Sequence, residues 1–370
     1  MAKPLTVLQV LPALESGGVE RGTLELAAGL VAAGHRSLVI SGGGQLVPSL
    51  TGQGGEHFTW PIGKKSLFTF GMSRALRKFI KNQQVDILHA RSRMPAWVAY
   101  RAWKHLSKRK RPGFVTTVHG LYSVKRYSSV MTRGERVIAV SSAAVQYLEN
   151  NYPKLDASRI RLIERGIDQQ IYQFDYRPSE AWLRRWYSDF PFLVGRKILT
   201  LPGRITRRKG HLDFIEMMAR LVNLGKPVYG LIVGGNDPRH VTYVDELHKA
   251  IEKHGLWQHI TFTGNRLDLC DIMAVSDMVF SLSIKPESFG RTVQEALSLG
   301  VPVVAYDHGG VSDLLQRAFP AGRVLPGEVD SLEQTVKQLL VKPVEVVPYN
   351  FQSIQDMINA TIEVYGELRR

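Results

Sequence analysis

Two carboxylates bracket a glycine-containing turn in the segment from Pro286 to Glu295. Glu287 lies in the turn and Glu295 lies two turns into a predicted helix, so both can reach a ligand placed over the N-terminus of that helix. The backbone N–H groups of Phe289 and Gly290 suit an anionic group at the same place. Because carboxylates accept hydrogen bonds from vicinal hydroxyls, the pattern favours a ribose or hexose carrying a phosphate. The alternative is a capped helix with one solvated glutamate.

A cationic loop follows an apolar run at 198–201. Four cations stand between Gly203 and Gly210, namely Arg204, Arg207, Arg208 and Lys209. The carboxyl end of a strand in an α/β sheet is the usual place for phosphate binding. Arginine offers a planar fork to phosphate oxygens and lysine a compact charge. The loop therefore predicts a phosphate site, with a solvated basic loop as the alternative.

Two further positions follow predicted strands in the N-terminal half. Gly17 and Gly18 open a helix, where small residues let the backbone approach an anionic ligand. The G-x-G-x-x-G spacing of a dinucleotide site is absent, and an ordinary turn is the alternative. His119 ends the apolar run at 114–119. It is either a residue of the functional site or a structural histidine. No Asp-x-Asp motif or His/Asp cluster has metal-ligand spacing, so no metal site is predicted.

Short apolar runs alternate with helical patterns along most of the chain. The first series of predicted strands covers 5–11, 37–41, 85–89, 114–119 and 137–141, and the second covers 198–201, 229–233, 260–262, 278–282 and 303–305. Such alternation is typical of doubly wound parallel sheets. We therefore expect an α/β fold with a Rossmann-like domain at 1–172, a junction at 173–196, a second Rossmann-like domain at 197–348 and a terminal helix within 349–370.

Charge separates the two halves of these 370 residues. The net charge is +15, and residues 1–172 hold 25 Lys+Arg against 10 Asp+Glu, whereas residues 173–370 hold 23 of each. The stretch from Lys64 to Arg136 alone has 18 basic residues and two acidic ones. The first domain is thus expected to meet an anionic partner. The composition excludes disorder and collagen. The single Cys270 excludes an internal disulfide and suits a reducing, cytoplasmic setting, and no signal or membrane-spanning segment is predicted.

Jointly, these motifs resemble those of the family-4 retaining glycosyltransferases of GT-B fold. The motifs stand in the family's order and span almost the whole chain, at Gly17–Glu20, His119–Gly120, Gly203–Gly210, Glu287–Gly290 and Glu295. The resemblance implies two Rossmann-like domains facing a cleft, with a C-terminal helix that crosses back to the N-terminal domain. It also implies metal-independent transfer of a hexose-type sugar from a UDP- or GDP-linked donor, with no cofactor. Arg165 stands before Gly166 where relatives usually carry Asn, so the resemblance assigns it no role.

The resemblance also implies roles for individual residues. Arg204 and Lys209 bind the donor diphosphate, and cations placed there stabilise the negative charge of the leaving group. Glu295 holds the ribose hydroxyls, Glu287 holds the hydroxyls of the transferred sugar, and His119 lies beside the reacting sugar. The other implied donor contacts are Gly17, Gly18, Arg266, Leu267, Ser288, Phe289 and Gly290. By analogy with the family, the acceptor hydroxyl attacks from the front face and loses its proton to the leaving phosphate.

The basic region indicates where the acceptor lies. Its cations are interleaved with apolar and aromatic residues such as Phe79, Trp97 and Trp103. This pattern suits an anionic membrane surface, although a solvated basic face would look the same. We expect the first domain to dock on the inner face of the cytoplasmic membrane. A glycolipid such as a lipopolysaccharide core precursor would be the acceptor.

Two other functions fit parts of the pattern. A GT-B-fold epimerase of nucleotide sugars or a sugar phosphorylase would leave the basic face unused. A nucleic-acid-binding protein would explain the net charge. It would not explain Glu287 and Glu295, because carboxylates repel a phosphate backbone, and no nucleic-acid partner is expected.

Overall fold

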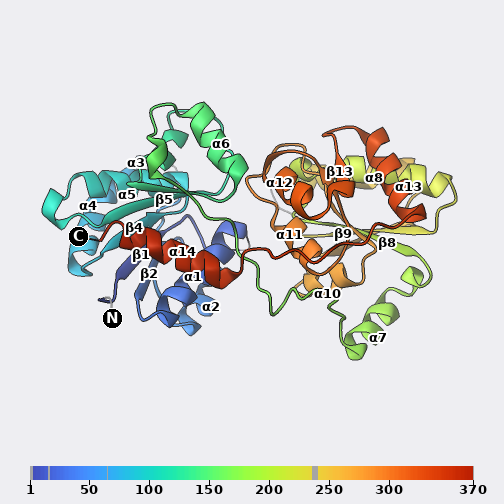
Figure 1. Ribbon diagram of the computed structural model, residues 1–370, viewed down its shortest axis with the longest axis horizontal. Coiled ribbons are helices and arrows are strands. Elements are labelled where there is room, and N and C mark those ends of the chain that lie inside the picture. Colours follow the sequence, from blue (N-terminus) through green and yellow to red (C-terminus); the bar gives the residue numbers. More distant parts are fainter. Residues whose placement is uncertain (1–2, 16, 65, 236–240, 370) are drawn as a thin grey trace. The chain divides into compact units, whose positions relative to one another are not determined.

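The computed structural model of the chain describes residues 3–15, 17–64, 66–235 and 241–369. It divides into two compact units. Unit 1 comprises residues 1–166 and 352–370, and unit 2 comprises residues 167–351. Ser16 of the first glycine loop and Lys65 of the basic region lie outside the described residues. Each unit is described by itself below (Figure 1).

Unit 1 is built on a parallel sheet of seven strands in the order β3-β2-β1-β4-β5-β6-β7. Its strands are β1 (Thr6–Val10), β2 (Arg36–Ser41), β3 (Glu56–Thr59), β4 (Ile87–Ala90), β5 (Gly113–Val118), β6 (Arg136–Ala139) and β7 (Ile160–Leu162). The strand order reverses between β1 and β4, which pair in parallel with Val7 opposite Ile87. Ligands of open α/β sheets bind outside the carboxyl ends of the strands at such a reversal.

The helices of unit 1 are α1 (Gly18–Ala32), α2 (Val47–Gly52), α3 (Leu67–Gly71), α4 (Ser73–Asn82), α5 (Arg93–Lys104), α6 (Ser142–Asn151) and α14 (Ile354–Gly366). Short 3₁₀ turns lie at Lys108–Lys110, Ser128–Thr132 and Ala157–Arg159. The apolar positions of α1 give it a buried face that includes Leu26 and Leu30. Both side chains belong to a core cluster with Val7 and Ile87 of the sheet.

The terminal helix α14 belongs to unit 1 although the whole of unit 2 precedes it in the sequence. It lies beside α1 (Figure 1). A Ser353–Asp356 capping box begins the helix. Met357, Ile358 and Tyr365 are buried in the same core cluster as the first strands. The predicted return of the C-terminal helix to the N-terminal domain is confirmed.

Unit 2 contains a second parallel sheet, of six strands in the order β10-β9-β8-β11-β12-β13. Its strands are β8 (Lys197–Pro202), β9 (Val228–Val233), β10 (Ile260–Gly264), β11 (Met278–Ser281), β12 (Val303–Tyr306) and β13 (Arg323–Val324). Its α-helices are α7 (Glu180–Asp189), α8 (His211–Asn223), α9 (Val241–Lys253), α10 (Leu269–Ala274), α11 (Arg291–Ser298), α12 (Gly309–Ala318) and α13 (Val329–Val341), and 3₁₀ turns lie at Pro191–Leu193, Arg207–Lys209 and Pro320–Gly322. The order reverses between β8 and β11, so the prediction of two doubly wound sheets is confirmed.

Residues 173–196 are part of unit 2, which begins at Ile167. The aromatic residues of this stretch pack into the unit. Trp182 and Trp186 of α7 stack with their ring centroids 5.0 Å apart. Both are buried in one core cluster with Ile198 and Tyr229 of the sheet. The aromatic composition that suggested a junction therefore reflects a helix covering β8 and β9. No helix among the described residues is long and apolar enough to cross a bilayer.

Candidate active site

Most of the predicted donor residues of unit 2 lie at the reversal of its strand order, whereas Arg266 and Leu267 follow the edge strand β10. The loop after β8 carries Arg204 and Lys209, and the loop after β11 carries Glu287 and Ser288. Since β8 and β11 are neighbours in a parallel sheet, both loops leave the same edge side by side. The structure thus brings the cationic loop and the carboxylate loop together.

Lys209 and Glu287 form the centre of this edge. Lys209 Nζ donates to Glu287 Oε1 at 2.6 Å, and Ser283 Oγ donates to the same oxygen. Burial by itself would raise the pKa of Glu287, but Lys209 and Ser283 outweigh it and lower the pKa below its ordinary value. The carboxyl is therefore charged at neutral pH. The pair offers a lysine cation for phosphate and a carboxylate for sugar hydroxyls.

Two glycines allow backbone segments to approach each other closely beside Lys209 and Glu287. Gly210 has a φ of 70° and precedes α8, and a Cβ there would lie 2.0 Å from the carbonyl oxygen of Leu282. Gly309 has a φ of 61°, and a Cβ added to it would lie 2.4 Å from the carbonyl oxygen of Glu287. Gly310 N also donates to Glu287 O at 2.8 Å. The backbone of Glu287 is thus fixed by the N-terminus of α12.

Helix α11 supplies the second carboxylate. Glu295 is buried, and its Oε1 accepts from Arg291 Nε at 3.1 Å. Phe289 is buried just before the helix, and Gly290 is the N-cap residue. Buried Glu295 is the fifth residue of α11, so it lies a little over one turn from the start of the helix, rather than the two turns expected from the sequence.

The other donor residues predicted in unit 2 differ in their surroundings. Arg204 is exposed in the loop after β8. Arg266 makes a two-pronged ion pair with Asp268, with N–O distances of 2.9 and 2.6 Å, and Asp268 also accepts from Trp182 Nε1. Leu267 is fully exposed. The Arg266 guanidinium thus fixes its own loop, and the adjacent Leu267 presents an apolar side chain to solvent.

Unit 1 places the first glycine loop at the N-terminus of α1. Gly17 is the N-cap residue and Gly18 begins the helix. A Cβ at Gly17 would lie 2.4 Å from Glu20 Oε2, whereas nothing lies within 4 Å of one at Gly18. The loop follows β1, one of the two strands at the reversal of the sheet. Gly17 and Gly18 therefore occupy the position where this class of sheet binds ligands.

Arg165 contacts this same helix. Its Nη2 donates to Glu25 Oε2 at 3.1 Å and to Gly18 O at 3.4 Å. The Arg165 and Glu25 side chains are 9% and 14% exposed, so the ion pair is largely buried. Gly22 leaves room for the guanidinium, because a Cβ there would lie 1.8 Å from Nη2. The position that departs from the family pattern thus ties the loop after β7 to the start of α1.

His119 follows β5 at the same edge of unit 1. Burial, together with the charges of Arg91 and Arg165 and the nearby His89, lowers the pKa of His119 well below its ordinary value. A neutral imidazole both donates and accepts one hydrogen bond. His119 is therefore suited to binding a hydroxyl group at neutral pH.

Several residues at these edges were not predicted from the sequence. Buried Arg91 donates to Gln9 Oε1 at 3.1 Å, and its burial lowers its pKa to about 10. His89 hydrogen-bonds with Tyr365 of α14 at 2.7 Å. In unit 2, His308 Nε2 lies 2.7 Å from Ser283 O. The only local signal was their place just before or after a predicted strand end, which many loop residues share.

Two doubly wound parallel sheets in one chain are the architecture of the GT-B class of α/β proteins. Residues 16–171 match the family described as Glycosyltransferase Family 4, and residues 188–360 match Glycosyl transferases group 1. A glycosyltransferase from Rickettsia africae is 30% identical, with a TM-score of 0.85 and coverage of 99% of both chains. The chain therefore belongs to the family-4 glycosyltransferases of GT-B fold.

More distant relatives share parts of the sequence or only the fold. A lipopolysaccharide core biosynthesis mannosyltransferase of Rhizobium meliloti is 30% identical over 187 residues, which are 50% of this chain and 49% of that protein. The alignments with the first curated relatives span about half or less of those proteins. An Anabaena protein, HepE, solved in complex with UDP and glucose, has the same fold at 20% identity, with a TM-score of 0.79 and coverage of 99% and 96% of the two chains.

Proposed function

We propose that this chain is a retaining, metal-independent glycosyltransferase. It moves a hexose-type sugar from a UDP- or GDP-linked donor to a membrane-associated glycolipid, such as a lipopolysaccharide core precursor. The observation that carries the proposal is the Lys209–Glu287 pair at the strand reversal of unit 2. Family membership and the UDP and glucose bound by the HepE fold relative support a nucleotide-sugar donor.

Different residues of unit 2 bind different parts of the donor. Arg204 and Lys209 bind the diphosphate, and Ser288, Phe289 and Gly290 meet the distal phosphate or the sugar. Glu287 binds the hydroxyls of the transferred sugar. Glu295 binds the ribose hydroxyls, and Arg266 and Leu267 lie along the base. The exposed Leu267 side chain and the charged Glu287 carboxyl fit these roles.

The reaction follows from the charge that develops as the donor bond breaks. The bond between the anomeric carbon and the phosphate oxygen breaks, and negative charge accumulates on the diphosphate. Preplaced cations at Arg204 and Lys209 lower the barrier by stabilising that charge without a metal ion. The acceptor hydroxyl attacks the anomeric carbon from the face that the diphosphate leaves, which retains the configuration, and its proton passes to the leaving phosphate oxygen. Neutral His119 binds a hydroxyl of the reacting sugar, and Gly17 and Gly18 approach the phosphates.

The charge of unit 1 supports an anionic acceptor surface. Counted over the two units, residues 1–166 and 352–370 hold 27 Lys+Arg against 12 Asp+Glu, whereas unit 2 holds 21 of each. The exposed cations include Arg74 and Lys78 of α4 and Lys104 of α5, and the ring of Phe68 is also exposed. Helices α4 and α5 pack against each other. We infer that this surface docks on the inner face of the cytoplasmic membrane, near a glycolipid acceptor.

The experiment that tests the proposal follows the transferred sugar. The protein is incubated with EDTA, a panel of UDP- and GDP-sugars and a lipopolysaccharide core acceptor, and the product is examined by ¹H NMR. We expect nucleoside diphosphate release and a product whose anomeric configuration equals that of the donor. An inverted product or activity restored only by added metal would contradict the proposed mechanism.

A further inference from the structure

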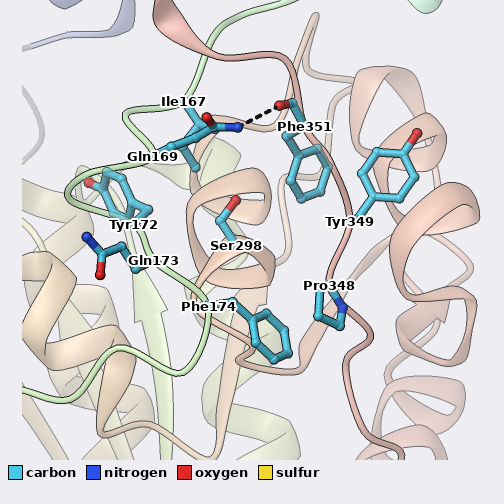
Figure 2. A pocket seen from close by; sticks show the side chains of 9 residues that line it. All are labelled: Ile167, Gln169, Tyr172, Gln173, Phe174, Ser298, Pro348, Tyr349 and Phe351. Atoms are coloured by element: carbon cyan, nitrogen blue, oxygen red, sulfur yellow. Dashed lines mark hydrogen bonds between the residues drawn. The ribbon is translucent and has the colours of Figure 1, made fainter.

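A cavity of 270 Å³ lies in unit 2, and its described lining includes none of the predicted donor residues (Figure 2). Three parts of the unit enclose it: the segment at 167–174, the segment at 348–351 and the last residue of α11. The side chains that line it are those of Ile167, Gln169, Tyr172, Gln173, Phe174, Ser298, Pro348, Tyr349 and Phe351. Its volume is slightly below the roughly 300–1,000 Å³ of ordinary small-molecule pockets, so it suits a small ligand.

Aromatic rings form much of the wall. Tyr172 and Phe174 come from the first segment, and Tyr349 and Phe351 come from the second (Figure 2). The rings of Tyr349 and Phe351 lie 4.8 Å apart at an angle of 54°. Such rings present flat apolar faces, and the tyrosines add a polar tip.

A buried hydroxyl lies at the floor of the cavity. Ser298 lines the cavity, and its Oγ is almost completely buried and has no hydrogen-bond partner among the described residues. Figure 2 shows this side chain between Tyr172 on one side and Phe351 on the other. Buried polar groups are nearly always hydrogen-bonded, so an unpaired hydroxyl facing a cavity indicates a missing partner.

Amide groups stand at the rim. Gln169 Nε2 donates to Phe351 O at a distance of 3.4 Å, which is long for a hydrogen bond and joins the two segments across the cavity (Figure 2). Gln173 is exposed beside it. None of the described lining residues carries a charge. A phosphate or a carboxylate would therefore find no cation in the wall.

We propose that this cavity is an accessory binding site for a neutral monosaccharide. The apolar C–H face of a pyranose packs on aromatic rings, and its hydroxyls exchange hydrogen bonds with amides and with Ser298 Oγ. The ring-lined, uncharged wall and the unpaired hydroxyl match this ligand. None of the described lining residues belongs to the proposed donor site, and the occupancy of the cavity does not depend on the proposed reaction.

The position of the cavity gives its occupancy a structural consequence. The chain leaves unit 1 at Gly166 and returns to it at Gln352, so the two walls are the segments that connect the units. A sugar that contacts both segments adds contacts between them to the long Gln169–Phe351 hydrogen bond. Ser298 also lies on the helix that carries Glu295. Binding therefore stabilises the connecting segments and raises the melting temperature of the protein.

The test is direct binding of methyl glycosides, which cannot act as donors. Methyl α-glucoside, methyl α-mannoside and methyl α-galactoside are titrated into the wild type and Glu287→Gln by saturation-transfer NMR and thermal shift. We expect saturable binding of at least one glycoside, equal in both proteins. Ser298→Ala removes a hydroxyl that has no partner in the fold, so it folds normally and weakens binding about tenfold, the effect of one hydrogen bond. Ser188→Ala, an exposed serine on α7, is the matched control and leaves binding unchanged.

Four results would overturn the proposal. The first is the absence of saturable binding by any glycoside, and the second is loss of binding in Glu287→Gln, which would place the sugar in the donor site. The third is equal affinity of wild type and Ser298→Ala for the glycoside. The fourth is tighter binding of glucose 6-phosphate than of the neutral glycosides. A protein that fails to transfer sugar but binds a glycoside through Ser298 would contradict the proposed function alone.

Discussion

Lys209 is the residue whose loss should affect the reaction most selectively. Lys209→Ala removes the cation nearest to Glu287, and with it the stabilisation of the leaving diphosphate. Loss of one preplaced electrostatic group at a reacting centre typically costs about 100- to 1,000-fold in kcat. We expect a fall of that order in the rate of nucleoside diphosphate release, measured at saturating donor.

Lys197→Ala provides the matched control in the same unit. Lys197 forms an ion pair with Asp277 at 2.8 Å. It is the first residue of β8, so it lies at the amino end of the strand, whereas Lys209 follows the carboxyl end. We expect wild-type kcat for this variant. Equal losses of activity in Lys197→Ala and Lys209→Ala would contradict a specific role for Lys209.

The lowered pKa of Glu287 predicts a stability difference that depends on pH. A carboxyl whose pKa is lower in the folded state stabilises the protein above its unfolded pKa of about 4.5 and loses that contribution as the pH falls through the folded pKa. Glu287→Gln should therefore lower the melting temperature at pH 7, and the difference from wild type should shrink below about pH 4.5. Thermal unfolding across this range is the measurement, and a difference that grows toward acid pH would contradict the assignment.

At the residue scale, the sequence predicted Lys209 and Glu287 as site residues but not the neighbouring residues that hold them in place. Glu287 and Lys209 were recognised because charged residues followed strand ends beside glycines. Ser283 and His308 carry no such pattern. Ser283 donates to Glu287 within the loop after β11, and His308 contacts that loop from the loop after β12. Arg165 was visible only as a departure from the family, and its partner Glu25 looked like an ordinary helix residue.

At the scale of elements, the Arg165–Glu25 pair fixes α1 to the loop after β7. Breaking a buried ion pair by removing one partner typically destabilises a protein by about 3–5 kcal/mol, because the other charge stays buried. We expect Glu25→Gln to lower the stability of unit 1 by an amount near the lower end of that range. Exposed Glu15→Gln is the control, and hydrogen exchange of the α1 amides is the measurement.

The double variant decides whether the pair acts as a unit. In Glu25→Gln/Arg165→Gln neither buried charge remains, so the loss of stability should be smaller than the sum of the two single losses. Strictly additive losses would show that the two side chains stabilise α1 independently.

The sequence predicted the central strands better than the edge strands. β1, β4, β5, β8 and β11 are almost entirely buried and mainly apolar, and each was predicted. The unpredicted strands are β3, β7 and β13, and each lies at an edge of its sheet. Edge strands are covered on fewer sides, as in the partly exposed β7, so their residues show no apolar run. The pairing of α14 with α1 also depended on long-range packing, and only the family resemblance indicated it.

At the scale of the whole molecule, the charge of unit 1 predicts salt-sensitive membrane binding. The chain should sediment with vesicles rich in anionic phospholipid at low ionic strength and dissociate at high salt. Replacing Lys104, Lys108, Arg109 and Lys110 by serine should weaken binding more than tenfold, at about 1 kcal/mol per charge. These four side chains are exposed.

A second quartet controls for the loss of charge itself. Replacing exposed Arg184, Arg185, Lys249 and Lys253 of unit 2 removes the same net charge from the electroneutral unit. Vesicle binding should then stay near that of the wild type. Equal loss in both quartets, or binding that resists high salt, would refute docking through unit 1.

The central claim is that the edge formed by Lys209 and Glu287 binds a nucleotide sugar. Calorimetric titration of the wild type, Lys209→Ala, Glu287→Gln and Lys197→Ala with UDP- and GDP-sugars in EDTA tests it most directly. We expect one donor to bind the wild type and Lys197→Ala with equal affinity and Lys209→Ala at least tenfold more weakly. Glu287→Gln should lose the preference for the nucleotide sugar over the free nucleoside diphosphate. Absence of binding by every donor, or equal affinity in all four proteins, would contradict it.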